Sequence, residues 1–531
     1  MMFPILADFG IISSLIVSLI ISAISTGVMY LLRPKPSSGL KPTKFGEFEV
    51  PTHEQGTPCA VILGTPARSS GYELLWYGDY STQKVESEDV VINYKYYCGA
   101  HLGLSLGNLD GILQIWSDVC LWPTLNDPTV YAADGETSIL IVANTIWGGK
   151  KRGGGLYGQI DVLYGGSDQA VNTYLAAQLP TPLPVGDLPA FRGVATLVFE
   201  KFYWGTAPRM AVLAFVPKRI NKLHDGTSQW YLAKAVINIY ELNIVHAIRE
   251  AMTSGVWGSG LDTALIDATT FEAAADTLYA EGMGISYRYM RDQENVKAFI
   301  RVLEEIGDLV VYFDDEAGLY KIKLIREDYD PDDSGALTTY TENDFEITQF
   351  ARPSPIDTPC RTIVWYTDRA SAQRAPAFDD DPALLERQGG TPITQEFEWP
   401  MIHDPDLANT LVAREQRQAS AMPAGLSLSC ERTMHDLRRG DVFRITHPRL
   451  LAEGVEAMIV RVVQVSRGRL EDGALTIQVV EDIFSGATAV YTSPPDTDWI
   501  DPTEDTTNPS DTTLTNAANA ATGQLLNEIV S

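Results

Sequence analysis

The sequence lacks the paired residues from which metal sites and disulfide frameworks are built. Its 531 residues include five scattered cysteines and seven dispersed histidines. Because zinc sites need clustered ligands at short spacing, we predict no metal and no cofactor. An odd cysteine count without a CxxC pair also argues against a disulfide framework and indicates free thiols in a reducing cytosol. The cysteines are Cys59, Cys98, Cys120, Cys360 and Cys430.

Basic residues are also scarce. The chain has 40 Lys and Arg against 69 Asp and Glu, a net charge of -29. Because phosphate contacts need Lys and Arg, this balance argues against a nucleic-acid-binding surface. An acidic wall would let duplex DNA slide past, so the charge fits either a conduit or solubility alone. No HExxH motif is present and nothing selects a catalytic carboxylate pair, so we predict that the protein is not an enzyme.

What the chain does contain is clearest in residues 243–328, where helical and strand spacings alternate. The predicted elements are three helices, from about Asn243, after the Thr269–Thr270 pair and from about Val296, and two strands, Leu309–Phe313 and Tyr320–Ile325. Thr270 is the expected cap of the second helix, and Phe271, Ala274, Ala275 and Leu278 its buried face. We interpret this region as an α+β module.

Most other segments resemble short strands separated by turn residues, which predicts β-rich barrels or sandwiches. The clearest runs are Ala60–Leu63, Glu73–Tyr77, Val90–Leu106, Ile112–Trp116, Val194–Phe199 and Met210–Val216.

Two motifs invite a catalytic interpretation and are better explained structurally. The glycine-rich segment Ile146–Tyr157 lacks the P-loop order, and strand-like sequence follows it, so we predict the tip of a β-hairpin. Arg192 stands beside Gly193 before a buried strand, which is typical of a residue that braces a loop.

Four segments occur in the order found in one protein family. They are the opening strands Phe48–Tyr80, the glycine-rich hairpin, Leu188–Ala195 and the Gly-Asp turn in Leu437–Ile445. Together with residues 243–328, this order resembles the tail-tip or baseplate hub proteins of long-tailed, siphovirus-like phages, similar to the N-terminal hub region of the lambda tail-tip protein J and to gene transfer agent hub proteins. Phe191 stands where the family has Tyr, and Arg439 where it commonly has Pro. The resemblance implies that Trp76–Asp79 closes a hairpin and that Val194–Phe199 and Met210–Val216 are paired strands.

The resemblance implies a structural role in the virion, at the phage tail tip, after assembly in the host cytoplasm. It implies a homotrimer whose tube-like barrels join the sixfold tail tube to a threefold tip and form or close the DNA-ejection channel during host cell entry. The implied partners are the distal tail protein, the tape-measure protein and other tail-tip and receptor-binding proteins. Genomic DNA would pass through the lumen without specific binding. A tail-associated cell-wall hydrolase and a membrane-anchored binding protein are the alternatives.

The segment from Phe9 to Leu32 carries no charge and is long enough to span a bilayer. Its serines and Gly27 would let helices approach closely, so we favour a hydrophobic helix that packs inside the particle. Host-membrane contact during genome delivery and a permanent membrane anchor stay open. The candidate interface residues are Ile11, Leu15, Leu19, Ile20, Ile24, Val28 and Leu32.

These patterns predict a β-rich α+β multi-domain chain. The predicted divisions are an N-terminal hydrophobic helix (1–33), a linker (34–50), a β-rich hub domain (51–235), the α+β module (236–333), a second β-rich hub domain (334–487) and an acidic flexible tail (488–531). The tail has no Lys or Arg, and its Asp, Thr and Pro residues cannot form a core.

Overall fold

The computed structural model describes residues 41–485, with internal gaps. The gaps are 52–58, 69–70, 88–89, 118–119, 123–137, 142–154, 179–187, 292, 328, 331–336, 431, 453 and 468–472. The predicted N-terminal helix, its seven interface residues and the C-terminal tail lie outside the described residues. By its internal contacts the chain forms two units. Unit 1 comprises residues up to Ile325 with 365–376 and 398–407, and unit 2 comprises the remainder.

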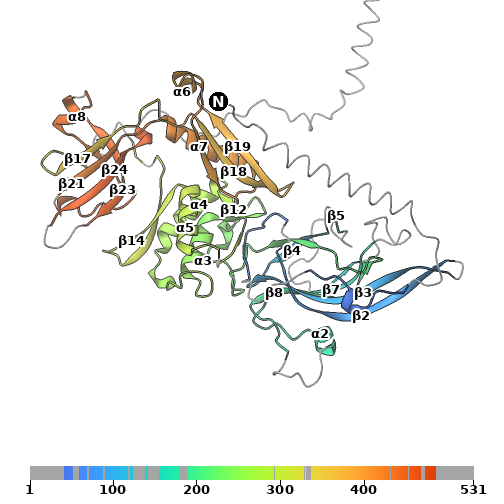
Figure 1. Ribbon diagram of the computed structural model, residues 1–531. Helices are drawn as coiled ribbons and strands as arrows, with labels where there is room; N and C mark the ends of the chain where they lie inside the picture. Colours follow the sequence, from blue (N-terminus) through green and yellow to red (C-terminus); the bar gives the residue numbers. More distant parts are fainter. Residues whose placement is uncertain are drawn as a thin grey trace, which may run out of the picture. The chain divides into compact units, whose positions relative to one another are not determined.

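Strands dominate the described residues, as expected from the sequence (Figure 1). Unit 1 contains a seven-stranded sheet in the order β13-β1-β3-β8-β7-β6, with β2 paired to β3. Its strands are β1 (Val61–Leu63), β2 (Glu73–Ser87), β3 (Val90–Leu106), β6 (Ser138–Ile141), β7 (Tyr157–Leu163), β8 (Val194–Gly205) and β13 (Tyr287–Tyr289). A second sheet has the order β5-β4-β9. Its strands are β4 (Gly111–Ser117), β5 (Cys120–Leu121) and β9 (Leu213–Lys218).

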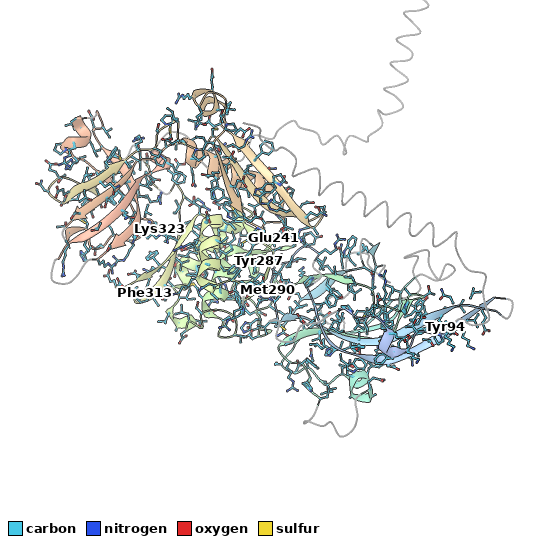
Figure 2. The ribbon with its side chains drawn as sticks, viewed as in Figure 1. Tyr94, Glu241, Tyr287, Met290, Phe313 and Lys323 are labelled. Carbon is cyan, nitrogen blue, oxygen red and sulfur yellow. The ribbon has the colours of Figure 1, made fainter. Side chains whose placement is uncertain are left out.

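An aromatic core lies between these strands. The ring of Trp122 stacks on Phe202 at 5.6 Å between centroids, and Phe202 lies 5.0 Å from Trp204. All three side chains are at most 3% exposed. Burial of each large side chain contributes on the order of 2 to 3 kcal/mol, so β8, which supplies two of them, is central to stability. In Figure 2 Tyr94 marks the buried side of β3 in this part of the chain.

Two sequence predictions about these strands are wrong. Trp76–Asp79 does not close a hairpin, because β2 continues to Ser87 and the irregularity at Gly78 is a bulge against β3. The predicted runs Val194–Phe199 and Met210–Val216 fall mainly on β8 and β9, but these strands do not pair with each other. β8 pairs with β3 and β7, while β9 pairs with β4. Adjacency along the chain did not determine the partner of either strand.

The three predicted helices are present between β11 and β14 (Figure 1). Their bounds are α3 (Ile244–Thr253), α4 (Ala268–Ala280) and α5 (Val296–Gly307). Asn243 and Asn295 cap α3 and α5 by accepting backbone hydrogen bonds. The cap predicted for α4 is wrong: Asp267 accepts from the Thr269 and Thr270 amides, and Thr270 lies inside the first turn. A carboxylate at this position also interacts favourably with the helix dipole.

Short strands accompany these helices. They are β10 (Val236–Ile237), β11 (Glu241–Asn243), β12 (Gly284–Ile285), β14 (Leu309–Asp314) and β15 (Leu319–Leu324). The hairpin β14–β15 was expected from the sequence and pairs over six residue pairs. Phe271, Ala274, Ala275 and Leu278 are buried as predicted. In this unit there are also α2 (Thr173–Gln178), η1 (Phe45–Glu47), η4 (Leu232–Lys234) and η5 (Thr263–Leu265).

Unit 2 is built on a six-stranded sheet in the order β16-β22-β23-β24-β21-β17. Its strands are β16 (Thr339–Tyr340), β17 (Phe345–Ala351), β21 (Gly425–Cys430), β22 (Val442–Ile445), β23 (Met458–Ser466) and β24 (Leu475–Glu481). β21 alternates buried and half-buried side chains, as expected of a strand with one face on a core. In the predicted Gly-Asp turn, Gly440 has φ +88° and Asp441 accepts from the Arg438 amide, so Arg439 in place of proline leaves the turn intact.

The remaining elements include a three-stranded sheet in the order β19-β18-β20. The elements are β18 (Arg361–Asp368), β19 (Gln373–Asp380), β20 (Thr394–Glu398), α6 (Pro382–Arg387), α7 (Pro405–Ser420), α8 (Pro448–Ala452), η6 (Arg432–Met434) and η7 (Ile483–Ser485). Among the described residues, no helix is long and apolar enough to cross a membrane.

Candidate functional site

The segment Val61–Ala67, which we call the junction segment, lies where several distant parts of unit 1 meet. Its first three residues form β1, which pairs antiparallel with β13 and makes a parallel bridge to Leu106 of β3. Gly64 then exchanges two backbone hydrogen bonds with Arg219, of 3.0 and 2.9 Å. A single short segment therefore connects the large sheet to the elements that follow β9.

Gly64 is required at this position by its surroundings. Its φ is +70°, a conformation that side chains other than glycine rarely adopt. A Cβ added here would lie 2.4 Å from the backbone oxygen of Ile285. The close approach of two backbones thus explains why the sequence has glycine directly after β1.

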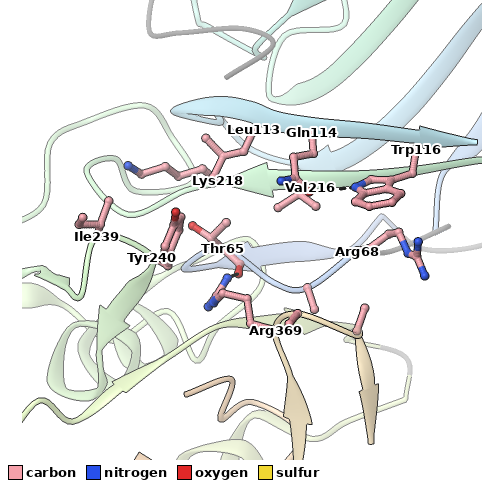
Figure 3. A pocket seen from close by; sticks show the side chains of 13 residues that line it. Thr65, Arg68, Leu113, Gln114, Trp116, Val216, Lys218, Ile239, Tyr240 and Arg369 are labelled. Atoms are coloured by element: carbon pink, nitrogen blue, oxygen red, sulfur yellow. Dashed lines mark hydrogen bonds between the residues drawn. The ribbon is translucent and has the colours of Figure 1, made fainter. Parts of the chain in front are cut away.

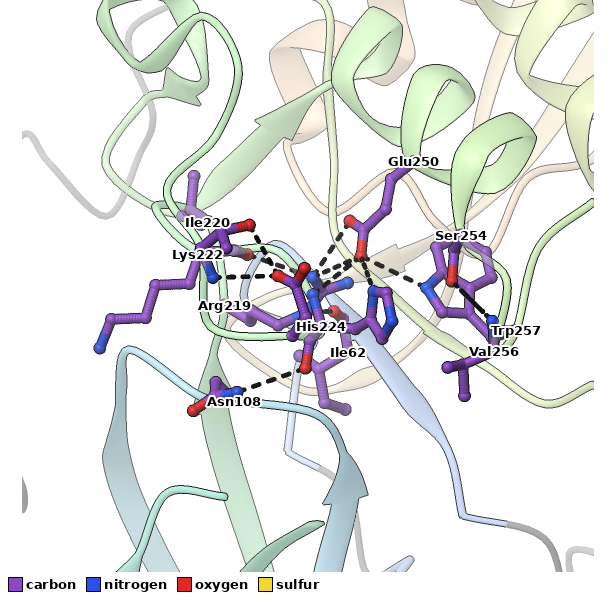
Figure 4. Close-up of polar contacts among 12 residues, drawn as sticks. Ile62, Asn108, Arg219, Ile220, Lys222, His224, Glu250, Ser254, Val256 and Trp257 are labelled. Atoms are coloured by element: carbon purple, nitrogen blue, oxygen red, sulfur yellow. Dashed lines mark hydrogen bonds and ion pairs between the residues drawn. The ribbon is translucent and has the colours of Figure 1, made fainter. Parts of the chain in front are cut away.

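A buried ion pair fixes the next contact of the junction segment (Figure 4). Arg219 Nη1 lies 2.8 Å from Glu250 Oε1, and both side chains are at most 1% exposed. The guanidinium also donates from Nε to the Ile62 carbonyl and from Nη1 to the Lys222 carbonyl. Glu250 belongs to α3, so the pair joins that helix to β1 and to the chain after β9.

Glu250 accepts further hydrogen bonds. The backbone amide of His224 and the indole Nε1 of Trp257 both donate to Oε1, at 3.1 and 3.3 Å. Burial by itself would raise the pKa of Glu250, but Arg219 and the hydrogen bonds from His224 outweigh it and hold the pKa below its usual value. The carboxylate is therefore charged at neutral pH and acts as a structural anchor.

A second arginine binds the other end of the junction segment. Arg369 Nη1 donates to the Thr65 carbonyl at 2.8 Å, and Nη2 donates to Ser286 Oγ and pairs with Glu241. Its guanidinium also lies over the Tyr240 ring, 4.8 Å from the centroid. Burial raises the pKa of Glu241, and Arg369 offsets part of that rise. Glu241 is labelled in Figure 2.

His403 completes the polar contacts of this segment. Its Nε2 accepts a hydrogen bond of 3.0 Å from the Ala67 amide. Burial, together with the nearby charge of Arg369, lowers the pKa of His403 to about 3. The imidazole is thus neutral at physiological pH, as an acceptor at Nε2 requires.

A cavity of about 430 Å³ opens beside these contacts, and Figure 3 shows its lining. Three cationic side chains, Arg68, Lys218 and Arg369, contribute to its wall, and none of the lining residues is acidic. The guanidinium of Arg68 lies over Trp116 at 4.7 Å from the ring centroid. The indole Nε1 of Trp116 donates to Gln114. We call this cavity the cationic pocket. The full lining is Thr65, Ala67, Arg68, Leu113, Gln114, Trp116, Val216, Lys218, Ile239, Tyr240, Arg369, Ala370 and Ala372.

The structure describes one of the two motifs with a catalytic appearance in full and the other in part. Arg192 is exposed and donates to the Gln169 carbonyl, which confirms the loop-bracing interpretation. Strand β7 follows the glycine-rich segment, which itself lies largely outside the described residues, and β7 pairs with β6 as in a hairpin. Among the described residues, no group of three or more His, Cys, Asp or Glu side chains could hold a metal ion. The described cysteine side chains are free thiols.

One further motif is present in the sequence and was not recognised there, because the prediction that the protein is not an enzyme assumed no GxSxG pattern. The stretch Gly103–Gly107 reads GLSLG and fits this nucleophile pattern. Ser105 is buried within β3 rather than exposed at a strand-to-helix turn. Its hydroxyl has no hydrogen-bond partner among the described residues.

Sequence reasoning missed both the junction segment and the cationic pocket. Most of the contacts that define them join residues far apart in the chain, such as Ala67 with His403 and Thr65 with Arg369. The only local signal was Gly64, one of 42 glycines. No spacing rule could have related it to Arg219.

The fold is similar to that of a chain from a gene transfer agent virion. A chain of the virion of a native gene transfer agent particle matches with a TM-score of 0.50 and 16% sequence identity, over 90% of this chain and 98% of that one. The resemblance expected from the sequence is thereby confirmed at the level of the fold. No protein-family model and no curated protein matches the sequence.

Two tail proteins of known structure are more distant. The 43 kDa tail protein of prophage MuSo2 from Shewanella oneidensis is 10% identical, with a TM-score of 0.27, over 71% of this chain and 99% of that one. The tail protein from Neisseria meningitidis MC58 is 8% identical, with a TM-score of 0.28, over 82% of this chain and 99% of that one. At these TM-scores neither likeness supports a conclusion about this chain.

Proposed function

We propose that this chain is a structural component of a phage-like tail, and specifically a homotrimeric hub at the tail tip or baseplate. In this role its β-rich parts join the sixfold tail tube to a threefold tip and form or close the channel through which DNA is ejected. The distal tail protein, the tape-measure protein and receptor-binding proteins are its proposed neighbours. It works as a scaffold in the virion and carries no catalytic activity of its own.

The single observation that carries the proposal is the fold likeness to a chain of the gene transfer agent virion. It covers 90% of this chain and 98% of the other, so it is not confined to one common module. The order of glycine, proline and aromatic motifs in the sequence supports the narrower assignment to the hub. The net charge of -29 is compatible with a lumen that does not hold DNA.

The physics of the junction segment suits a mechanical role. Buried, paired charges such as Arg219 and Glu250 give a contact one geometry, because any displacement leaves a charge without its partner. A collar that transmits force during DNA ejection needs such fixed connections. Neither alternative, a cell-wall hydrolase or a membrane-anchored protein, gains support from a specific contact in the described residues.

A cryo-electron map of the tail end of intact particles tests this proposal. We expect density for three copies of this chain directly below the last sixfold ring of the tail tube. Twofold or monomeric density, or absence of the chain from purified particles, would contradict it. Turnover of cell-wall polymer by the purified chain would contradict the scaffold role independently of its position.

A further inference from the structure

The cationic pocket has a basic lining, in contrast to the acidic composition of the chain as a whole. In a protein with 69 acidic and 40 basic residues, the described residues of its wall include three cations and no Asp or Glu. Part of the charge of Arg369 is compensated by Glu241, which stands behind the wall and does not line it. The pocket is therefore suited to an anionic partner.

The remaining walls are apolar and aromatic. Leu113, Val216 and Ile239 contribute aliphatic surface, and Trp116 and Tyr240 contribute rings already in contact with arginines. Figure 3 shows Ile239 and Tyr240 on one side of the pocket and Trp116 on the other. Such a mixture fits a peptide with an aromatic anchor between acidic residues better than a small inorganic anion.

The backbone at the rim supports a binding role. Ile239 is 68% exposed and has φ +69°. A β-branched residue in this conformation is strained by about 1 to 2 kcal/mol, and an exposed isoleucine there gains little from burial within the chain. Strained residues of this kind are concentrated at binding sites.

The chain itself contains a segment of matching chemistry. Residues 493–505 read SPPDTDWIDPTED and contain five acidic residues, no basic residue and one apolar pair, Trp499–Ile500. This pair stands between Asp498 and Asp501, so an indole and a carboxylate could enter the pocket together. A segment of such composition does not form a core of its own and is available for docking.

We propose that the acidic segment 493–505 of this chain docks in the cationic pocket, with Trp499 against its apolar wall and the neighbouring carboxylates against Arg68 and Lys218. The occupant follows from charge complementarity and from the single aromatic anchor of the segment. The proposal goes beyond the tail-tip role and does not depend on it, because it concerns recognition between two parts of the same polypeptide.

A labelled peptide tests the docking. A fluorescein-labelled peptide of residues 493–505 is titrated with the full-length chain carrying Trp499→Ala, which disables the chain's own segment, and fluorescence anisotropy is measured. We expect the peptide to bind the Trp499→Ala chain saturably. It should bind the chain with Trp499 intact at least about fivefold more weakly, because the native segment competes for the pocket. Raising the salt from about 0.05 to 0.5 M should also weaken binding, because it screens the ionic contacts.

Charge reversals locate the site. In the Trp499→Ala background, Lys218→Glu and Arg68→Glu should each weaken binding about tenfold or more. Lys84→Glu, an exposed lysine on β2 outside the pocket, serves as the matched control and should change affinity less than about twofold. Circular dichroism and the urea midpoint establish that each variant is folded.

Several results would overturn the proposal. The first is that the labelled peptide does not bind, and the second is that a peptide with Trp499→Ala binds with equal affinity. The third is that Lys84→Glu and Lys218→Glu weaken binding equally, which would indicate non-specific charge attraction. Equal binding by the chains with and without Trp499 would show that the native segment does not occupy the pocket.

Discussion

Arg219 and Glu250 lie 31 positions apart and form an ion pair of 2.8 Å from which solvent is almost completely excluded. The pair is not isolated. The Ile62 and Lys222 carbonyls accept from the arginine, while Trp257 and the His224 amide donate to the carboxylate. Because each charge depends on the other, loss of either partner leaves an uncompensated charge inside unit 1.

Glu250→Gln should lower the free energy of unfolding of unit 1 by about 3 kcal/mol, because it leaves the buried Arg219 guanidinium without a counter-charge. Urea unfolding followed by tryptophan fluorescence measures the change. Glu398→Gln is the matched control: it breaks the exposed pair with Arg374, which is 2.6 Å long, and should cost less than about 1 kcal/mol. Equal losses for the two variants would contradict the importance assigned to the buried pair.

Gly64→Ala should destabilise the protein by about 3 kcal/mol. The new Cβ adopts an unfavourable positive φ and also meets the backbone at Ile285. Gly193→Ala separates the two effects, because Gly193 has φ +77° but no atom within 4 Å of the added Cβ. We expect that control to cost about 1 kcal/mol in the same denaturation experiment. If both variants behave alike, close backbone approach at the junction segment is not significant.

Glu200→Gln should change the pH dependence of stability. Burial, together with the neighbouring Asp161, raises the pKa of Glu200 to about 7. The folded state thus favours the protonated carboxyl. The contribution of Glu200 to the stability of the folded state is therefore fully present below about pH 4.5 and is lost as the pH rises through 7. The substitution removes this decrease in stability at high pH. After allowance for solvent screening, it should stabilise the protein at pH 8 by about 1 kcal/mol and have little effect at pH 4.5.

Urea midpoints at pH 4.5, 6 and 8 measure this effect. Glu86→Gln, at an exposed position of β2, is the control and should follow the wild-type profile. A Glu200→Gln curve parallel to the wild-type curve at all three pH values would refute the assignment.

Ile239→Asn should stabilise the chain by about 1 kcal/mol, because asparagine tolerates a positive φ better than a β-branched residue. Val212→Asn is the control: Val212 is 59% exposed and does not have a positive φ, so its replacement should stay within about 0.5 kcal/mol of wild type. Thermal unfolding of the three proteins gives the comparison. A destabilised Ile239→Asn variant would show that the isoleucine contributes more through packing than it costs in strain.

Local patterns predicted much of the secondary structure. The apolar spacing around Val296 gave α5, and the alternation from Val90 to Leu106 gave the full length of β3. Both follow from short-range periodicity, which depends on neighbouring residues alone. The cap of α4 was misplaced by three residues, because Asp267 and Thr270 are both acceptable caps and only the hydrogen bonds of the folded helix distinguish them.

Such local patterns did not predict which strands pair or which distant side chains meet. β8 and β9 follow each other in sequence yet pair with different strands, since register and neighbour depend on which faces are buried together. The cationic pocket was missed for the same reason. Its cations are separated by up to 301 positions, from Arg68 to Arg369, and composition alone indicated an acidic protein.

The sequence by itself determined the β-rich character, the three helices between 244 and 307 and the resemblance to phage tail proteins, because these depend on local periodicity and on the order of short motifs. The tertiary structure alone decided that Gly64 meets Ile285, that Arg219 pairs with Glu250 and that three cations share one pocket. Such contacts form only when chain folding brings distant residues to one place, and desolvation then gives them their strength.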